Sequence, residues 1–297
     1  MSNICDLNRR YYELIELLKK DIPQVVIRAL KEDLGGQIDV SNDITSNLLP
    51  TNIKAFARII TREVGIFCGK RWVKEIFNQL NQNITIIWHV TDGQKITPGQ
   101  LLFEIEGSAR ILLTAERTVL NFIQTLSGIS TKVSYYASLL KNSSTKLLDT
   151  RKTLPGLRTA LKYAVICGGG INHRIGLSDA FLIKENHIIA IGSIKKAIKK
   201  AISIFPDNLI EIEVESIDEL IQAINAGAHI VMLDNFGLEE IHQAVKFNKG
   251  RVILEVSGNI NDFFIKNIAK SGVDYVSVGD LTKNICSIDM SMRIKIK

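Results

Sequence analysis

The chain has 297 residues, of which 46% are hydrophobic, and it carries a formal net charge of +6 at pH 7. This size and apolar content supply ample core for one large domain or two smaller ones. No stretch reaches the roughly 18 apolar residues that a membrane helix needs. No long apolar segment opens the chain either, so we expect a cytoplasmic protein without a membrane partner.

The basic residues are scattered along the chain. The one dense run, Lys195-Lys196 with Lys199-Lys200, is interspersed with Ile and Ala and is typical of the exposed face of an amphipathic helix. Because no aromatic residues accompany it, the charge does not predict a nucleic-acid partner. The four cysteines are far apart and match no zinc or redox spacing, which indicates reduced thiols.

The first region, residues 1–115, is predicted to be an α/β sandwich. Residues 12–34 have the apolar period of a helix, which Pro23 is expected to split in two. From residue 55 the period shortens to that of strands, with one helix between them. The expected strands are 55–60, 64–67, 84–90 and 101–105, and the expected helix is 71–80.

The C-terminal tail has a pattern of its own. From Ile288 to Ile296, apolar and polar residues alternate strictly, which is typical of a half-buried strand. We therefore expect residues 286–297 to fold back and complete the sheet of the first region.

The second region, residues 116–285, begins with a long helix over 116–140 that could be interrupted at Gly128. Strands and helices then alternate, which predicts parallel strands with right-handed crossovers. The expected strands are 146–149, 180–183, 209–214, 230–233, 252–256 and 275–278. They favour an irregular parallel α/β barrel with fewer than eight strands. A doubly wound open sheet is the alternative, although no Gly-x-Gly-x-x-Gly follows its first strand.

Charged and glycine-rich residues follow these strands at their carboxyl ends, where the loops of an α/β barrel converge. Arg151 and Lys152 follow the first strand and Lys184 follows the second. Guanidinium groups bind carboxylates in a bidentate manner, and lysines with free backbone N–H groups bind phosphates. The pattern predicts a socket for a small molecule with several negative charges.

Two carboxylates, Glu213 and Asp234, and the small residues Ser257, Gly258 and Gly279 lie at the later strand ends. Each has an ordinary interpretation: a carboxylate that alternates out of a strand, a helix N-cap, or a simple turn. Their common position at one end of consecutive strands favours a site. Two carboxylates of this kind can bind Mg²⁺ through water and substrate oxygens. No Ser–His–Asp or Cys–His arrangement supports covalent acyl chemistry.

Several segments in order resemble the quinolinate phosphoribosyltransferase family, also called carboxylating nicotinate-nucleotide pyrophosphorylases. The strongest are residues 116–121 (ERTVLN), 149–153 (DTRKT), 168–174 (GGGINHR) and 182–187 (LIKENH). Residues 211–215, 232–235 and 275–279 support them. The resemblance implies an N-terminal α/β sandwich followed by an α/β barrel of fewer than eight strands, and a homodimer in which an arginine, here Arg117, reaches the partner's site.

The resemblance also implies roles for the strand-end residues. By this resemblance, six residues surround quinolinate and the phosphoribosyl donor. They are Thr150, Arg151, Lys152, His173, Arg174 and Lys184. Glu213 and Asp234 would hold ribose hydroxyls and Mg²⁺, and with Lys152 and Lys184 they are the expected catalytic residues. The remaining expected substrate-binding residues, which include the lining of the 5-phosphate site, are Ser257, Gly258, Asn259, Val278, Gly279 and Asp280.

The chain departs from the family pattern in a few places. Asn259 stands where the family usually has Gly, and we expect Asn to keep the turn because it tolerates a left-handed backbone. Glu185 stands where Asp is more usual. Residues 40–45 keep only the Asp-x-Thr part of an N-terminal motif, to which we assign no catalytic role.

The implied reaction transfers the 5-phosphoribosyl group of 5-phosphoribosyl 1-diphosphate to quinolinate, with loss of CO₂ and pyrophosphate, and forms nicotinate mononucleotide for NAD biosynthesis. Three alternatives remain open. Lys184 could form a Schiff base in an aldolase or decarboxylase. A sister enzyme could use nicotinate directly. A non-enzymatic anion-binding or phosphosugar-sensing protein would bind the donor without releasing CO₂.

Overall fold

The computed structural model describes residues 7–80 and 84–297, which belong to two compact units. The first, here called the barrel unit, comprises Tyr135–Lys152, Gly170–Asp280 and, at the start of the described chain, residues 7–12. The second, here called the sandwich unit, comprises Glu13–Ser134, Thr153–Gly169 and Leu281–Lys297. No helix in these described residues is long and apolar enough to cross a membrane.

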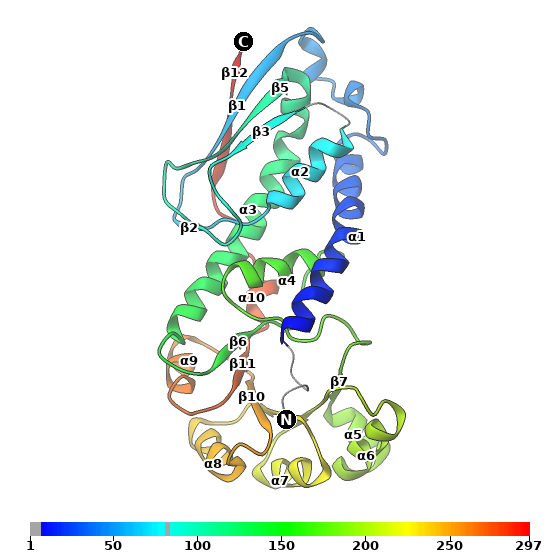
Figure 1. Cartoon of the computed structure of the whole chain (residues 1–297), viewed down its shortest axis with the longest axis vertical. Coiled ribbons are helices and arrows are strands. Elements are labelled where there is room, and N and C mark those ends of the chain that lie inside the picture. Colours follow the sequence, from blue (N-terminus) through cyan, green and yellow to red (C-terminus); the bar gives the residue numbers. More distant parts are fainter. Residues whose placement is uncertain (1–6, 81–83) are drawn as a thin grey trace. The chain divides into compact units, whose positions relative to one another are not determined.

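The sandwich unit is built on a four-stranded antiparallel sheet in the order β12-β1-β5-β3. In Figure 1 the C-terminal strand β12 runs beside β1, near the opposite end of the sequence. The predicted return of the tail is confirmed, because Ile294 pairs with Ala57 and Met292 with Ile59. The strands are β1 (Lys54–Thr61), β3 (Thr85–Trp88), β5 (Leu101–Ser108) and β12 (Met290–Ile296), with a small pair β2 (Gly65–Ile66) and β4 (Lys95–Ile96).

Three helices belong largely to this unit: α1 (Leu7–Asp33), α2 (Lys70–Gln79) and α3 (Ala109–Leu139), followed by the shorter α4 (Arg158–Cys167). The prediction that Pro23 splits the first helix is wrong, since α1 runs through it. Pro23 removes only the hydrogen bond to the carbonyl of Lys19, an exposed residue whose carbonyl can turn to water.

Helix α3 also differs from its prediction, because it begins seven residues earlier and is not interrupted at Gly128. Gly128 has a packing role instead. A Cβ there would lie 2.0 Å from the carbonyl oxygen of Cys286, so only glycine lets the segment that leads to β12 pass so close to the helix.

The barrel unit contains a six-stranded parallel sheet in the order β6-β11-β10-β9-β8-β7. The order is that of a barrel with one gap, because β11 pairs with β6 while β6 and β7 form the two edges. Ile171 forms a parallel bridge with Leu148 on β6. The strands are β6 (Lys146–Leu148), β7 (Phe181–Ile183), β8 (Ile210–Val214), β9 (Ile230–Asp234), β10 (Ile253–Ser257) and β11 (Tyr275–Ser277), which confirms the six that were predicted.

Helices surround the outer side of this sheet (Figure 1). Ser193, Ser216 and Asn261 each accept a backbone N–H at a helix start, so local capping fixes where a strand-to-helix loop ends. The helices are α5 (Glu185–Ile191), α6 (Ile194–Ile204), α7 (Ile217–Ala226), α8 (Leu238–Asn248) and α9 (Asp262–Ile268), and the four-residue α10 (Asp280–Lys283) follows β11. This arrangement leaves the strand ends and their loops to form a site.

Candidate active site

The carboxyl ends of the six strands lie at one edge of the sheet, as parallel pairing requires. Asp234 pairs with Ser257, and the N–H of Val278 donates to the carbonyl of Leu148 at 3.1 Å. Lys184 directly follows Ile183, which pairs with Ile212. The residues predicted at these ends therefore share one mouth, the term used here for this edge and its loops.

Two arginines of the mouth lie close enough for their charges to interact. Burial, and then the positive charge of Arg151, lower the pKa of the Arg174 guanidinium, while Glu211, Asp179 and Glu213 oppose this. Arg174 is buried and donates from Nη1 to the carbonyl of Ala180 at 3.2 Å. The Nε atoms of both arginines are buried without a hydrogen-bond partner. Two buried guanidinium donors of this kind are suited to bind an anion, which would reduce the repulsion and accept their hydrogen bonds.

The two lysines of the mouth have different surroundings. Lys184 forms an ion pair with Glu213, whose side chain is 18% exposed. The backbone N–H of Lys152 donates to Oγ1 of Thr150 at 3.0 Å. A Cβ on Gly279 would lie 2.7 Å from Cδ of Lys152, so this glycine permits the loop after β11 to approach the loop after β6.

The ends of β9 and β10 touch through their turns. Asn235 has a left-handed backbone with φ 58°, and its N–H donates to the carbonyl of Ser257 at 3.0 Å. Its amide nitrogen donates to Oδ2 of Asp234 at 3.1 Å. Gly258 has φ 133°, and a Cβ there would lie 2.7 Å from Oδ1 of Asn235.

The expected left-handed backbone at Asn259 is wrong. Asn235 and Lys249 are the non-glycine residues with positive φ in the described part of the chain. Gly258 and Asn235 take the unusual dihedral angles instead, so the turn does not depend on glycine at position 259.

Val278 and Asp280, the two predicted site residues on either side of Gly279, offer a backbone carbonyl and a carboxylate. Val278 is 2% exposed, and its N–H donates to the carbonyl of Leu148. Its backbone carbonyl is therefore the group that it can offer to a substrate. Asp280 begins α10 and is half-buried.

The segment that carries His173 and Arg174 is tied to the end of β6. The fully buried carboxylate of Asp149 accepts from the N–H of His173 at 2.8 Å and from the amide of Asn172 at 2.6 Å. Nδ1 of His173 accepts from the N–H of Arg174 at 2.8 Å. The nitrogen Nε2 lies 2.9 Å from Glu211 and 3.6 Å from Glu255. His173 thus has protein partners at both ring nitrogens, and its contact with substrate stays a prediction.

Glu211 and Glu255 were not predicted as site residues. They are 1% and 0% exposed and belong to β8 and β10, where the residues directly before and after each of them are apolar. A carboxylate within such a strand was the available signal. Glu211 and Glu213 are two residues apart and face the same side of β8, which answers the parity question left open by the sequence: Ile210, Ile212 and Val214 occupy the other side.

The atoms of His173, Glu211 and Glu255 that could bind a metal lie within 4.8 Å of one another. The tautomer argues against a metal: because Nδ1 accepts an N–H, the ring proton is on Nε2, where it points to Glu211. The two carboxylates raise the pKa of His173 in spite of its burial, but a second ring proton would break the bond from Arg174. A second proton in this cluster, besides the one on Nε2 of His173, is assigned to Glu255. Burial and then the charge of Glu211 raise the pKa of Glu255 to about 8.

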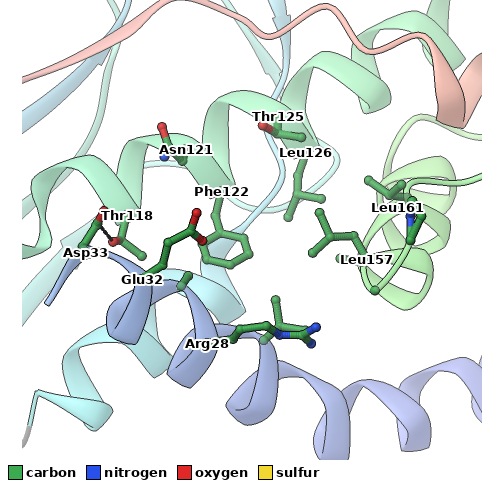
Figure 2. A pocket seen from close by; sticks show the side chains of 15 residues that line it. Arg28, Glu32, Asp33, Thr118, Asn121, Phe122, Thr125, Leu126, Leu157 and Leu161 are labelled. Carbon is green, nitrogen blue, oxygen red and sulfur yellow. Dashed lines mark hydrogen bonds between the residues drawn. The ribbon is translucent and has the colours of Figure 1, made fainter. Parts of the chain in front are cut away.

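Arg117 lies on α3 in the sandwich unit and is exposed. Among residues 7–80 and 84–297 it has no hydrogen-bond or ion-pair partner. The next residue, Thr118, donates to Oδ2 of Asp33 at 2.8 Å and so fixes this turn of α3 to α1. Figure 2 shows this bond at the rim of a hollow of about 370 Å³, lined entirely by residues of the sandwich unit.

That hollow contains none of the predicted site residues. A second hollow of about 310 Å³ lies beside β7 in the barrel unit and has Arg174 in its lining.

Comparisons with known proteins agree with this geometry. The family models for the N-terminal and C-terminal domains of quinolinate phosphoribosyl transferase match residues 43–127 and 129–293. The probable nicotinate-nucleotide pyrophosphorylase [carboxylating] of Bacillus subtilis (strain 168) is 40% identical over 89% of this chain and 90% of its own. The nicotinate-nucleotide pyrophosphorylase structure from Francisella tularensis is 49% identical, with a TM-score of 0.87, and the match covers 93% of this chain and 96% of that one.

The buried acid predicts a pH dependence of stability. Glu255 has a pKa of about 8 in the folded chain against an ordinary value of 4.5, so folding favours its protonated form. This contribution, at most about 5 kcal/mol, is fully present below pH 4.5 and is lost as the pH rises through 8. Melting temperatures between pH 5 and 9 should fall less steeply for Glu255→Gln than for the unchanged chain. Parallel curves would contradict the assignment.

Proposed function

The chain belongs to the quinolinate phosphoribosyl transferase family, and we propose that it performs the family's reaction at the mouth of the barrel unit. The protein is a nicotinate-nucleotide pyrophosphorylase of the carboxylating type. It transfers the 5-phosphoribosyl group from 5-phosphoribosyl 1-diphosphate to quinolinate, and releases pyrophosphate and CO₂ in NAD biosynthesis.

The observation that carries the site assignment is the pair of neighbouring arginines whose Nε atoms lack partners. Quinolinate has two adjacent carboxylates, and a planar guanidinium can bind each of them through two parallel hydrogen bonds. Arg151 and Arg174 are therefore the proposed carboxylate-binding residues. Each would gain a charge-assisted hydrogen bond and lose part of its repulsion from the other.

The phosphoribosyl donor is assigned to the remaining strand ends. Lys152 beside Gly279 and the turn Ser257–Gly258–Asn259 would hold its phosphates, because glycine permits close approach of phosphate oxygens to backbone N–H groups. Lys184 and Glu213, which already form an ion pair, would face the ribose.

The reaction needs no protein nucleophile. The ring nitrogen of quinolinate attacks C1 of the ribose as the bond from C1 to the diphosphate oxygen breaks, and the lysines stabilise the negative charge on the departing pyrophosphate. Glu213 and Asp234 favour the positive charge that develops on the sugar. The ring nitrogen becomes quaternary, and its positive charge stabilises the electron pair that stays on C2 when the 2-carboxylate departs as CO₂. A proton from solvent then completes C2.

Glu213 and Asp234 are also the residues proposed to hold Mg²⁺. Carboxylate oxygens at a partly exposed strand end suit this ion, which keeps several waters and binds through one or two carboxylates with substrate phosphates. When bound, it would neutralise charge on the diphosphate.

Arg117 and the assembly complete the proposal. An exposed arginine without a partner in the described residues, on a turn fixed by Asp33 and Thr118, is suited to serve a second subunit. We therefore propose a homodimer with shared sites. A cytoplasmic location is also proposed, in keeping with the unpaired thiols of Cys68, Cys167 and Cys286.

Two of the alternative enzymes are less well supported. A Schiff base needs a lysine amine that is free to attack a carbonyl carbon, whereas Nζ of Lys184 is engaged by the carboxylate of Glu213. An enzyme for nicotinate would have only one carboxylate to bind, whereas two arginines occur together at the mouth.

The test of the reaction is release of labelled CO₂ from quinolinate labelled in its 2-carboxylate, with the phosphoribosyl donor and Mg²⁺. We expect one CO₂ per nicotinate mononucleotide, no product from nicotinate, and loss of turnover on chelation that Mg²⁺ restores. Equal use of nicotinate would contradict the substrate assignment, and full turnover in excess chelator would contradict the metal proposal.

Arg151→Ala tests the carboxylate-binding pair. The change removes a bidentate contact, so kcat/KM for quinolinate should fall at least about tenfold, or roughly 1.4 kcal/mol of binding to the transition state. Arg58→Ala is a suitable control, because Arg58 forms an ion pair with Glu104 on the sheet of the sandwich unit. Unchanged quinolinate kinetics in Arg151→Ala would refute the role.

Mixed dimers test the shared site. An Arg117→Ala chain and a Lys152→Ala chain, each with its own affinity tag, should both be nearly inactive alone. A purified heterodimer should recover activity, up to about half, because one of its two sites then has both residues. No recovery in verified heterodimers would exclude sharing through Arg117.

A further inference from the structure

We propose that Glu211 and Glu255 are positioning residues for quinolinate binding, because they hold the ring of His173 and thereby the backbone of Arg174. The inference rests on the proposed placement of Arg174 at the substrate, and it extends the site to two buried residues below the mouth.

The contacts form a continuous path. Nε2 of His173 lies 2.9 Å from one oxygen of Glu211 and 3.1 Å from the other. On the opposite side of the ring, Nδ1 accepts the N–H of Arg174 at 2.8 Å. The ring is thus held at both nitrogens, and its orientation determines where the backbone of Arg174 lies.

Glu255 completes the path from the far side. Its carboxyl group lies 3.6 Å from Nε2, and neither of its oxygens has a hydrogen-bond partner. His173 has a single Nε2–H, which Glu211 accepts, so Glu255 is left without a donor. A buried carboxyl group without a donor is better accommodated when it is protonated and neutral. With that proton on Glu255, Glu211 remains the acceptor of Nε2–H, and His173 keeps the tautomer that Arg174 requires.

Stability alone does not explain these acids. Replacing a whole buried charged cluster by well-packed apolar residues is often neutral or stabilising, and apart from Glu213 and Ser257 the other residues of β8 and β10 are apolar. The position of Arg174 does supply a reason. Arg174 is buried, and the charge of Arg151 acts on its guanidinium, so a fixed backbone limits how far this side chain can turn away from the mouth.

The experiment compares Glu211→Leu and Glu255→Leu with the unchanged chain. Loss of the acceptor frees the imidazole, so KM for quinolinate should rise at least about tenfold while KM for the phosphoribosyl donor changes less than about threefold. Melting temperature is expected to fall in Glu211→Leu, because the buried Nε2–H of His173 loses its acceptor, so KM is measured well below the unfolding transition of each variant. Glu255→Gln, which keeps a neutral polar group, should restore most of what Glu255→Leu loses.

Glu104→Leu is the matched control, since Glu104 contacts Nε2 of His89 at 3.1 Å on the sandwich unit's sheet. It should leave KM for quinolinate unchanged. Equal increases in KM for both substrates, or changes that follow melting temperature alone, would overturn the proposal in favour of a structural role.

The tautomer of His173 and the binding of a transition metal provide two further tests of the proposal. Nitrogen NMR of the unchanged chain should find His173 protonated at Nε2 and not at Nδ1, and this test holds even if a Leu variant does not fold. The opposite tautomer, or one equivalent of bound transition metal that is lost in Glu255→Leu, would overturn the proposal.

Arg174→Ala separates this inference from the proposed site. If it raises KM for quinolinate and both Glu→Leu variants do not, the positioning role is wrong and the site stands. If Arg174→Ala leaves KM for quinolinate unchanged, the site assignment fails and the inference fails with it.

Discussion

The positive charges of Arg151 and Arg174, which act on each other at the barrel mouth, are the constraint on which the proposed substrate binding depends. Two guanidinium groups in a partly buried position are unfavourable unless negative charge lies nearby. Glu211, Asp179 and Glu213 supply some of it from within the chain, and they raise the pKa of Arg174 against the effect of its neighbour. The rest is left to the substrate. In the proposed site, a dicarboxylate would supply the negative charge that balances these two arginines.

The sequence was sufficient for those parts of the site that topology alone determines. Strand-to-helix alternation predicted parallel strands, and parallel strands bring Lys184, Asp234 and Ser257 to one edge whatever their detailed packing. Strict alternation in the tail predicted β12, and its pairing with β1 follows because a half-buried strand needs a sheet on which to pack. The roles of the individual site residues stay predictions.

What the sequence could not supply depends on three-dimensional register and on local compensation. Glu211 and Glu255 lie on non-adjacent strands, and only the curvature of the sheet brings them to one imidazole. Helix α1 continues through Pro23 because the carbonyl left without a partner is at the surface. The turn at position 259 keeps its shape through Gly258 and Asn235, which no pattern in residues 257–259 reveals.

The same charges bear on how the product leaves. In the proposed site, quinolinate would bring two carboxylates to the arginine pair, but decarboxylation converts one of them to neutral CO₂, and nicotinate mononucleotide retains a single ring carboxylate. One guanidinium then loses its charged partner while the repulsion from the other arginine remains. Departure of pyrophosphate removes negative charge from the lysines in the same turnover. The arrangement thus binds the substrate's charge more strongly than that of its product, so the chemical step itself favours release.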